Sequence, residues 1–290
     1  MNPGVVYALL AFVTWGLFPL YFKQLASVSA LEIVLHRSVW SLLCIALALL
    51  ALRRFGWMRE IAREPRRIGA FVLSALLIAG NWFLYALAIQ QAQVVEASLG
   101  YFINPLVSVM LGVLVLGERL RRLQWAAVAL AAAGVMWLTF ASGRLPWIAL
   151  ALALLFGLYG LVRKTASLGA LEGLALETLL LAPLVLPWLA WWTFANNGAM
   201  ARGDTQINLW LLLGGPLTAL PLLLFAAAAR RLPLATIGVL QYISPTIQFG
   251  LGVWAFGEPF DMTRLAGFGL IWAALVLYSV DAARRWPTPL

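Results

Sequence analysis

The chain has 290 residues, of which 63% are hydrophobic and 11% are charged. A soluble domain is about 45–50% apolar and about 25% charged, so this composition excludes a water-soluble globule. The single cysteine, Cys44, and the single histidine, His36, exclude a disulfide framework and a metal centre built from these residue types. The formal net charge of +9 would suit nucleic acid only if the basic residues formed a solvated face, so their positions decide that point.

Ten apolar stretches approach the length of about 20 residues that a transmembrane helix needs. In chain order they cover 4–22, 31–52, 68–89, 94–116, 123–140, 147–162, 170–194, 208–229, 233–256 and 263–280. The first is not a cleavable signal peptide, because nothing basic precedes it and Trp15 and Pro19 stand where small residues would be needed. We therefore predict an all-α integral membrane protein with ten transmembrane helices.

The basic residues are distributed unevenly over the predicted connections. The side that holds both termini carries 15 Lys and Arg residues and the opposite side carries 4, with Arg37 inside a stretch. By the positive-inside rule, both termini lie in the cytoplasm. The positive charge is then a topology signal that also suits contact with anionic lipid headgroups, and we expect no nucleic-acid partner.

An internal repeat with an offset of 140 residues relates the two halves of the chain. It pairs Gly117-Glu118 with Gly257-Glu258, Asn104-Pro105 with Ser244-Pro245, Ala30-Leu31-Glu32 with Ala170-Leu171-Glu172, and Tyr85 with Phe225. At an offset of 141, Gly16 pairs with Gly157 and Lys23 with Lys164. We predict two five-helix units, 1–140 and 146–282, followed by a cytoplasmic tail, 283–290. Because each unit has an odd number of spans, the second must be inverted, as in many secondary transporters.

Arg37 lies inside the second stretch, roughly 9 Å from its outer end at 1.5 Å per residue. Ionisable groups inside a membrane are costly and are functional candidates by default. Trp40 and Ser41 follow at i+3 and i+4 and therefore share its helix face. One interpretation is an anchor for an anion or carboxylate beside an aromatic wall. The other is a structural arginine that is paired internally or extends to the membrane surface.

Glu177 is the repeat counterpart of Arg37 and has the opposite charge. Inversion would place the two at depths that differ by about 10 Å in a hydrocarbon core of roughly 30 Å, so a direct salt bridge requires tilt or long side chains. Burial favours the neutral acid, which can carry a proton, and this makes Glu177 a candidate for proton coupling. The alternative is a neutral glutamic acid that is hydrogen-bonded within the bundle.

Further polar and aromatic side chains lie within the third, fourth and ninth stretches. They are Asn81, Trp82, Tyr85, Tyr101, Asn104, Gln241, Tyr242 and Ser244. The aromatic rings would form the apolar walls of a binding site, and the amides and hydroxyls would orient polar groups of a substrate. Prolines inside a span remove a backbone hydrogen bond, so kinks that could serve as hinges are expected at Pro19, Pro105, Pro221 and Pro245.

Glu118 and Glu258 each follow a glycine that ends a helix, where an anion is unfavourable. Each can turn instead to the amino end of the following helix. We therefore expect these two glutamates to cap helices.

Four segments resemble the RarD branch of the EamA-type transporters, in the drug/metabolite transporter superfamily. They are 32–41 (EIVLHRSVWS), 81–85 (NWFLY), 96–105 (EASLGYFINP) and 241–246 (QYISPT), and the resemblance covers nearly the whole chain. It implies ten helices in two inverted repeats, location in the bacterial inner membrane, and export or uptake of small metabolites or drugs. RarD-type proteins are named for chloramphenicol sensitivity, but superfamily relatives carry amino acids, nucleotide sugars or small cations, so the resemblance supplies no substrate.

The resulting hypothesis is a secondary transporter for a small amphipathic molecule, amino-acid-like or aromatic, that works by alternating access without cofactor, metal or catalytic residues. The fifth and tenth helices have few deep polar groups and would serve as scaffolding or as the face of a homodimer. One alternative is an integral membrane enzyme, although no cluster of deep acids or His-Asp pair is apparent. Another is a passive scrambling or structural membrane protein.

Overall fold

The computed structural model describes residues 2–63, 67–90, 94–141, 147–195, 198–255 and 262–283, and within these ranges the regular structure is helical. The first half contains α1 (Pro3–Gly16), α2 (Phe18–Gln24), α3 (Ala30–Leu52), α4 (Gly56–Arg63), α5 (Ile68–Gln90), α6 (Val94–Leu114) and α7 (Arg122–Ala141). The second contains α8 (Trp147–Thr165), α9 (Ala170–Ala195), η2 (Ala199–Arg202), α10 (Thr205–Ala229), α11 (Leu234–Leu240), α12 (Ile243–Ala255) and α13 (Met262–Ala283).

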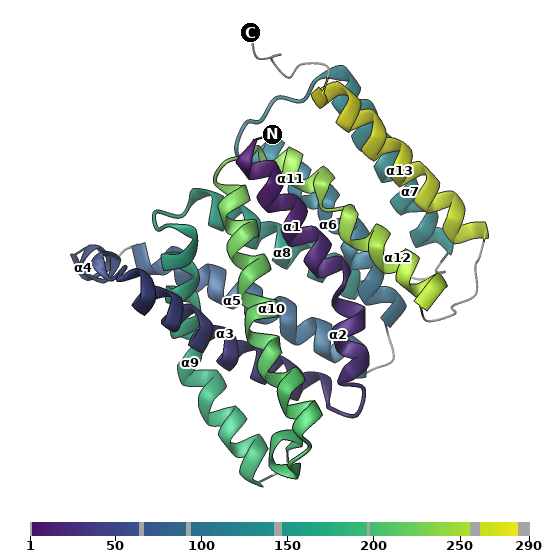
Figure 1. Cartoon of the computed structure of the whole chain (residues 1–290). Coiled ribbons are helices and arrows are strands. Elements are labelled where there is room, and N and C mark those ends of the chain that lie inside the picture. The colour runs from purple at the N-terminus through teal and green to yellow at the C-terminus, as the bar shows by residue number, and fades with distance from the viewer. Residues whose placement is uncertain are drawn as a thin grey trace.

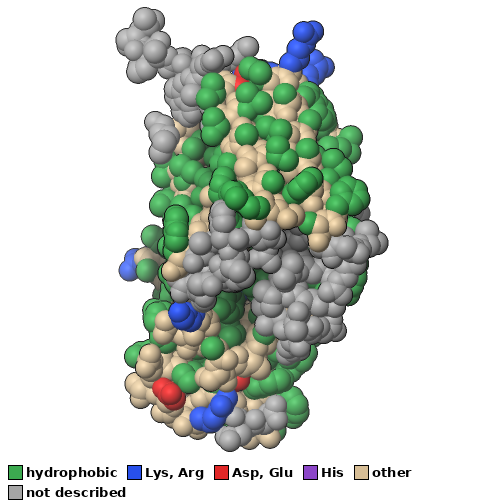
Figure 2. All heavy atoms as spheres, turned by 90° about the vertical axis from the view of Figure 1, so that its right-hand side faces the viewer, with side chains coloured by type: hydrophobic (Ala, Val, Ile, Leu, Met, Phe, Trp, Pro, Cys, Tyr) green, Lys and Arg blue, Asp and Glu red, His purple; other side chains and the backbone are tan. Residues whose placement is uncertain are grey.

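Seven helical stretches in the described residues are long and apolar enough to cross a membrane, and two shorter apolar helices accompany them. Large apolar side chains lie exposed on the outside, such as Phe140 at 80% and Phe194 at 87%. Figure 2 shows hydrophobic side chains spread over the upper part of the face on the α7 and α13 side, with charged groups at its top edge and in its lower half. An all-helical integral membrane protein accounts for this surface, because lipid replaces water around it.

Two of the expected single helices are interrupted. The first breaks at Leu17 between α1 and α2, and the ninth breaks at Gln241 and Tyr242 between α11 and α12. Pro19 and Pro245 stand just after these breaks, and each lacks the N–H that would bond to the carbonyl four residues earlier. Pro105 and Pro221, by contrast, lie inside the continuous helices α6 and α10. The hinge role of all four prolines stays a prediction.

The short helix α4 was not expected from the sequence. It projects from the end of α3 (Figure 1) and buries Trp57 and Ile61 in the largest core cluster. Arg59 and Arg63 are exposed on the same helix. This helix has eight residues and buries two apolar side chains, so it is far shorter than a membrane span. In the sequence it looks like part of an arginine-rich loop.

The packing of the helices relates the two halves. α3 lies against α9 and α10, α6 lies against α8 and α11, and α1 lies against α10 and α12 (Figure 1). α5 packs on α8 and α9, and α7 packs on α13. These contacts come in corresponding pairs when α8 is matched with α1 and α10 with α5. The contact of α1 with α10, for example, then corresponds to the contact of α8 with α5. α7 and α13 cross closely, since a Cβ atom on Gly134 would lie 2.8 Å from the carbonyl oxygen of Gly267.

Candidate functional site

Arg37 is placed in the interior by a well-capped helix. Ser29 caps α3 by accepting a hydrogen bond from the N–H of Glu32 at 3.2 Å, and the helix then carries Arg37 two turns inward. The Arg37 side chain is only 8% exposed. Its Nε donates to the Thr218 hydroxyl of α10 at 2.8 Å. The contact joins a helix of the first half to a helix of the second.

Aromatic rings surround the guanidinium. Its central carbon lies 5.0 Å from the Phe18 ring centroid and 5.7 Å from that of Phe22, both on α2, and 5.8 Å from that of Trp82 on α5. Each such contact contributes about 0.5–2 kcal/mol, depending on desolvation. The wall continues from Phe22 to Tyr85 at 6.2 Å and from Tyr85 to Tyr101 of α6 at 6.0 Å. We call these residues together the Arg37 cage: Arg37, Phe18, Phe22, Trp82, Tyr85, Tyr101 and Thr218.

Within the described ranges, the Arg37 guanidinium has no carboxylate partner. The ion pairs there involve other side chains, and Arg37 contacts the Thr218 hydroxyl and aromatic rings instead. A buried guanidinium keeps its charge and carries five N–H donors in a planar fork. The cage therefore suits a planar anionic group.

Glycine on α10 permits this close arrangement. A Cβ atom on Gly214 would lie 2.5 Å from the Tyr21 hydroxyl and 2.9 Å from Cγ of Arg37. The Tyr21 hydroxyl is buried and has no hydrogen-bond partner among the described residues. Any larger residue at position 214 would clash with these side chains unless they or α10 shifted.

Trp40 and Ser41 share the helix of Arg37 but have other partners. Trp40 Nε1 donates to His36 Nδ1 at 3.2 Å, and the two rings stack with centroids 6.5 Å apart. The Ser41 hydroxyl donates to the carbonyl of Ser38 at 3.0 Å. His36 Nε2 lies 3.9 Å from Glu32 Oε1, and Glu32 also accepts the N–H of Ala199. The described contacts therefore bring Trp82, Tyr85 and Tyr101 to the cage but direct Trp40 and Ser41 elsewhere.

Three of the remaining predicted residues, Asn81, Gln241 and Ser244, form hydrogen bonds to other helices. Asn81 Nδ2 donates to the carbonyl of Leu152 at 3.0 Å and ties α5 to α8. Gln241 Oε1 accepts from the Ser108 hydroxyl at 3.4 Å, and the Ser244 hydroxyl donates to the carbonyl of Phe12 at 2.5 Å. In the described part of the chain, no hydrogen bond links these side chains to Arg37. Gln241 and Ser244 lie instead at the break between α11 and α12.

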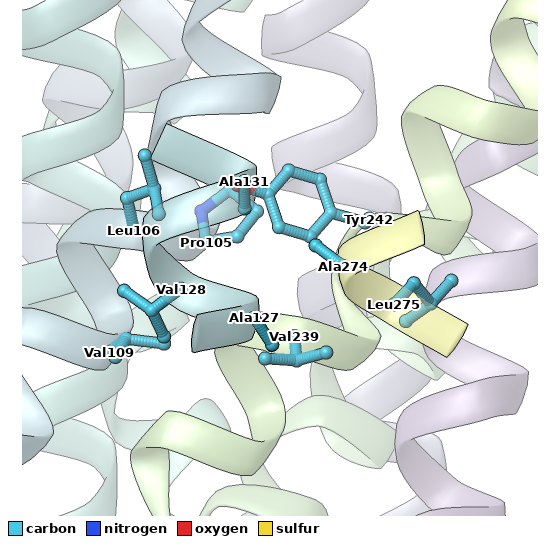
Figure 3. Close-up of a pocket in the computed structure, with 10 residues that line it drawn as sticks. All are labelled: Pro105, Leu106, Val109, Ala127, Val128, Ala131, Val239, Tyr242, Ala274 and Leu275. Carbon is cyan, nitrogen blue, oxygen red and sulfur yellow. The ribbon is translucent and has the colours of Figure 1, made fainter. Parts of the chain in front are cut away.

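Two buried side-chain atoms lack hydrogen bonds within the described ranges, the amide oxygen of Asn104 on α6 and the hydroxyl of Tyr242 at that break. Tyr242 borders a crevice between α6, α7, α11 and α13, whose other walls are apolar and include Pro105, Ala131 and Ala274 (Figure 3). An apolar crevice of this kind accepts hydrocarbon and offers little to a charged molecule. The Arg37 cage is therefore the better candidate for a polar substrate.

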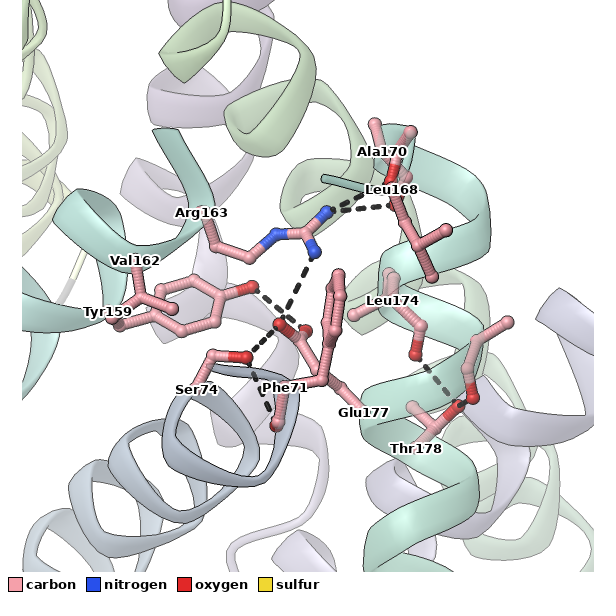
Figure 4. Close-up of polar contacts among 12 residues, drawn as sticks. Phe71, Ser74, Tyr159, Val162, Arg163, Leu168, Ala170, Leu174, Glu177 and Thr178 are labelled. Carbon is pink, nitrogen blue, oxygen red and sulfur yellow. Dashed lines mark hydrogen bonds and ion pairs between the residues drawn. The ribbon is translucent and has the colours of Figure 1, made fainter. Parts of the chain in front are cut away.

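Glu177 occupies a second buried charge site (Figure 4). Its Oε1 accepts from the Ser74 hydroxyl at 2.5 Å and from Arg163 Nη1 at 3.4 Å, and its Oε2 accepts from the Tyr159 hydroxyl at 3.4 Å. The ion-paired side chains are 0% exposed for Arg163 and 1% for Glu177. We call these four residues the Arg163–Glu177 cluster. It joins α5, α8 and α9.

Sequence reasoning missed Arg163, because it counted this residue among the cytoplasmic charges after the sixth span. The helix instead continues to Thr165 and holds Arg163 inside. Arg163 Nη2 also donates to the carbonyl of Ala170 at 3.1 Å, and the guanidinium lies 6.0 Å from the Phe71 ring centroid. Two sequence features are consistent with a buried Arg163. It follows Tyr159 by four residues and so shares its helix face, and Gly173 lacks the Cβ atom that would collide with the guanidinium.

Glu118 caps a helix, but not the one that was expected. Its carboxylate accepts the N–H of Leu234 at 2.7 Å and of Ala235 at 2.9 Å, at the start of α11 in the opposite half. Lys164 Nζ lies 3.8 Å from the same carboxylate. The prediction of the following helix, α7, was therefore wrong, because sequence neighbourhood does not reveal which helix end lies nearest in space. Glu258 lies outside the described residues.

Replacing Glu118 by alanine should lower the midpoint of thermal unfolding. Two backbone donors at the start of α11 would lose their acceptor, at a cost of about 1–3 kcal/mol. Differential scanning fluorimetry of the purified protein measures the change. Glu172→Ala is the control, because its ion pair with Arg54 at 3.3 Å is largely exposed on the arginine side and should contribute little. Equal stability losses in the two variants would contradict the capping role.

The sequence of the chain is similar to those of known proteins. The model of the EamA-like transporter family matches residues 2–140. An uncharacterized transporter of Pseudomonas aeruginosa is 50% identical, and the alignment covers 100% of this chain and 98% of that protein. Protein RarD of Streptomyces exfoliatus is 49% identical over 97% of this chain and 89% of its own length.

The chain is a RarD-type member of the EamA family. Identities near one half over almost the full length of both relatives decide this membership. A solved crystal structure with 20% sequence identity also superposes with a TM-score of 0.74, covering 97% of this chain and 98% of its own, and supports the fold. As an EamA-family protein of the drug/metabolite transporter superfamily, the chain is a membrane transporter.

Proposed function

We propose that this EamA-family protein is a secondary transporter that carries a small amphipathic metabolite or drug by alternating access. The observation that carries the proposal is the Arg37 cage, which combines side chains of α2, α3, α5 and α6 with Thr218 of α10. A polar site at the junction of two halves is where secondary transporters of repeat construction bind their substrates.

The proposed architecture has ten membrane passes in two inverted five-helix repeats. α1 with α2, and α11 with α12, would each form one interrupted pass, while α4 and η2 would lie outside the membrane. The exchangeable packing of the two halves and the offset of 140 residues support this arrangement. The uneven loop charge supports a bacterial inner-membrane protein with both termini in the cytoplasm. The fifth and tenth helices of this arrangement, α7 and α13, pack against each other. This contact favours a scaffolding role for them over a role as the face of a homodimer.

Flux into proteoliposomes tests the proposal against its rivals. The purified protein should mediate saturable uptake of at least one member of a broad panel of labelled metabolites and drugs. An enzyme would convert a compound without moving it, and a passive scrambling protein would move lipid without saturation. The absence of saturable flux across the whole panel would contradict transport.

We propose a structural role for Glu177 in preference to proton coupling, because three donors including Arg163 surround its carboxylate. A Glu177→Gln variant separates the two roles when uptake is measured with and without an imposed pH gradient. Unchanged gradient dependence supports the structural role. Loss of the gradient dependence, with uptake retained, would assign proton coupling to Glu177.

A further inference from the structure

The two buried charge sites occupy corresponding positions in the two halves. Counterparts at an offset of 140 are Arg37 with Glu177 and Gly214 with Ser74, and at 141 they are Phe18 with Tyr159 and Phe22 with Arg163. These are the offsets that relate the rest of each half. The Arg37 cage and the Arg163–Glu177 cluster are therefore two versions of one arrangement.

The counterparts also make corresponding contacts. Glu177 is bonded to Ser74, Tyr159 and Arg163. Arg37 lies against the backbone of Gly214 and faces the rings of Phe18 and Phe22. The same three neighbouring positions thus surround the charged residue in each half. What differs is the chemistry of those neighbours.

Charge balance distinguishes the two sites. In the second half, Arg163 neutralises Glu177 within the cluster. In the first half, Phe22 stands where that partner would be, so the described neighbours of Arg37 bring no opposite charge. An uncompensated buried charge costs several kcal/mol, which cation–π contacts and one hydroxyl offset only in part. Among the described side chains, the first site therefore lacks the counterion that the second site contains.

We propose that the substrate of this transporter is an aromatic monoanion whose carboxylate pairs with Arg37. This inference rests on the proposed transport function and names its substrate class. One guanidinium balances one negative charge, so a monoanion fits better than a doubly charged phosphate. The rings of Phe22, Trp82 and Tyr85 provide the surface for an aromatic body. The Arg163–Glu177 cluster already contains its own counterion, so its charge calls for no ligand.

Three probes of nearly equal shape test the charge preference: phenylacetate, phenylacetamide and 2-phenylethylamine. Binding to purified protein in nanodiscs is measured as thermal stabilisation at constant ionic strength, since a ligand of the native state raises its apparent stability. We expect phenylacetate to bind about tenfold or more tightly than the amide, because its bonds to the guanidinium are charge-assisted. The amine should give no stabilisation.

Variants at Phe22 reproduce the charge balance of the second half. Phe22→Glu supplies Arg37 with an internal counterion and should abolish the stabilisation by phenylacetate. Phe22→Gln changes the volume in the same way without adding charge, so it should retain the preference for phenylacetate over phenylethylamine. Arg37→Gln should lose this preference altogether.

Stabilisation by the amine that equals or exceeds that by phenylacetate would overturn the inference. So would stabilisation by phenylacetate that persists in both Phe22→Glu and Arg37→Gln, or the failure of all three probes to stabilise the wild-type protein. Uptake is scored separately in proteoliposomes. A protein that transports but prefers cations refutes the substrate class alone, whereas selective binding of phenylacetate without saturable flux of any compound refutes the transport function alone.

Discussion

Replacing Arg37 by glutamine is expected to reduce saturable uptake by at least about tenfold. The substitution removes the charge-assisted hydrogen bonds that a guanidinium offers to an anion, and each is worth about 1.5–3 kcal/mol. The thermal unfolding midpoint should stay equal or rise, because the described neighbours of Arg37 do not neutralise its charge. Initial rates in proteoliposomes, normalised to reconstituted protein, measure the effect.

Arg202→Gln is the matched control, because Arg202 is exposed on η2 and is not part of the cage. Its uptake should equal that of the wild-type protein. If Arg37→Gln folds and transports at the wild-type rate, Arg37 is a structural residue and the cage is not the binding site.

Removing one member of the buried ion pair is expected to destabilise the protein strongly. Arg163→Met or Glu177→Leu leaves the other charge buried without its counterion, which costs about 3–5 kcal/mol. Replacing both at once, as Arg163→Met with Glu177→Leu, removes both charges and should recover most of the loss. Unfolding midpoints of the three variants and the wild type form a double-mutant cycle.

Arg54→Gln is the control for loss of an arginine charge. Its ion pair with Glu172 is 60% exposed on the arginine side, so the unfolding midpoint should change little. A double variant no more stable than either single variant would show that the packing around the pair, and not its charge balance, holds α8 and α9 together.

The helices were largely predictable from the sequence, because lipid-exposed and core positions are alike apolar and leave long uninterrupted stretches. The expected 170–194 and 263–280, for example, correspond to α9 (Ala170–Ala195) and α13 (Met262–Ala283). The breaks before Pro19 and Pro245 were foreseen only as kinks. A proline removes one hydrogen bond wherever it stands, but packing decides whether the helix bends or stops, as the continuous α6 around Pro105 shows.

The candidate site was predictable only where a residue is chemically unusual for its surroundings. Arg37, Trp82 and Tyr85 stand out in apolar helices, and the described contacts bring them together. Phe18 and Phe22 resemble lipid-facing residues in the sequence, so their contact with Arg37 depended on the turn between α1 and α2. Thr218 reaches Arg37 because glycines allow α10 to approach α3, a tertiary feature that helical periodicity does not encode.

Arg163 shows how counting charges by loop can mislead. The positive-inside rule treats every arginine near a span end as solvated, and it needs only the sum to assign orientation. One residue moved from loop to core leaves the predicted topology unchanged. It alters the chemistry, however, because Arg163 gives Glu177 an ion-pair partner that the sequence did not reveal.

Solute counterflow tests the central claim, alternating access by a carrier, most directly. Proteoliposomes are loaded with a high concentration of an unlabelled substrate found in the uptake panel and diluted into buffer that contains a trace of the labelled compound. A carrier returns from the outside loaded with label while internal substrate competes for the exit, so label should accumulate transiently above its equilibrium level. The Arg37→Gln variant should show no such accumulation. Simple equilibration of label by the wild-type protein, without a transient excess, would contradict alternating access and indicate a passive pathway.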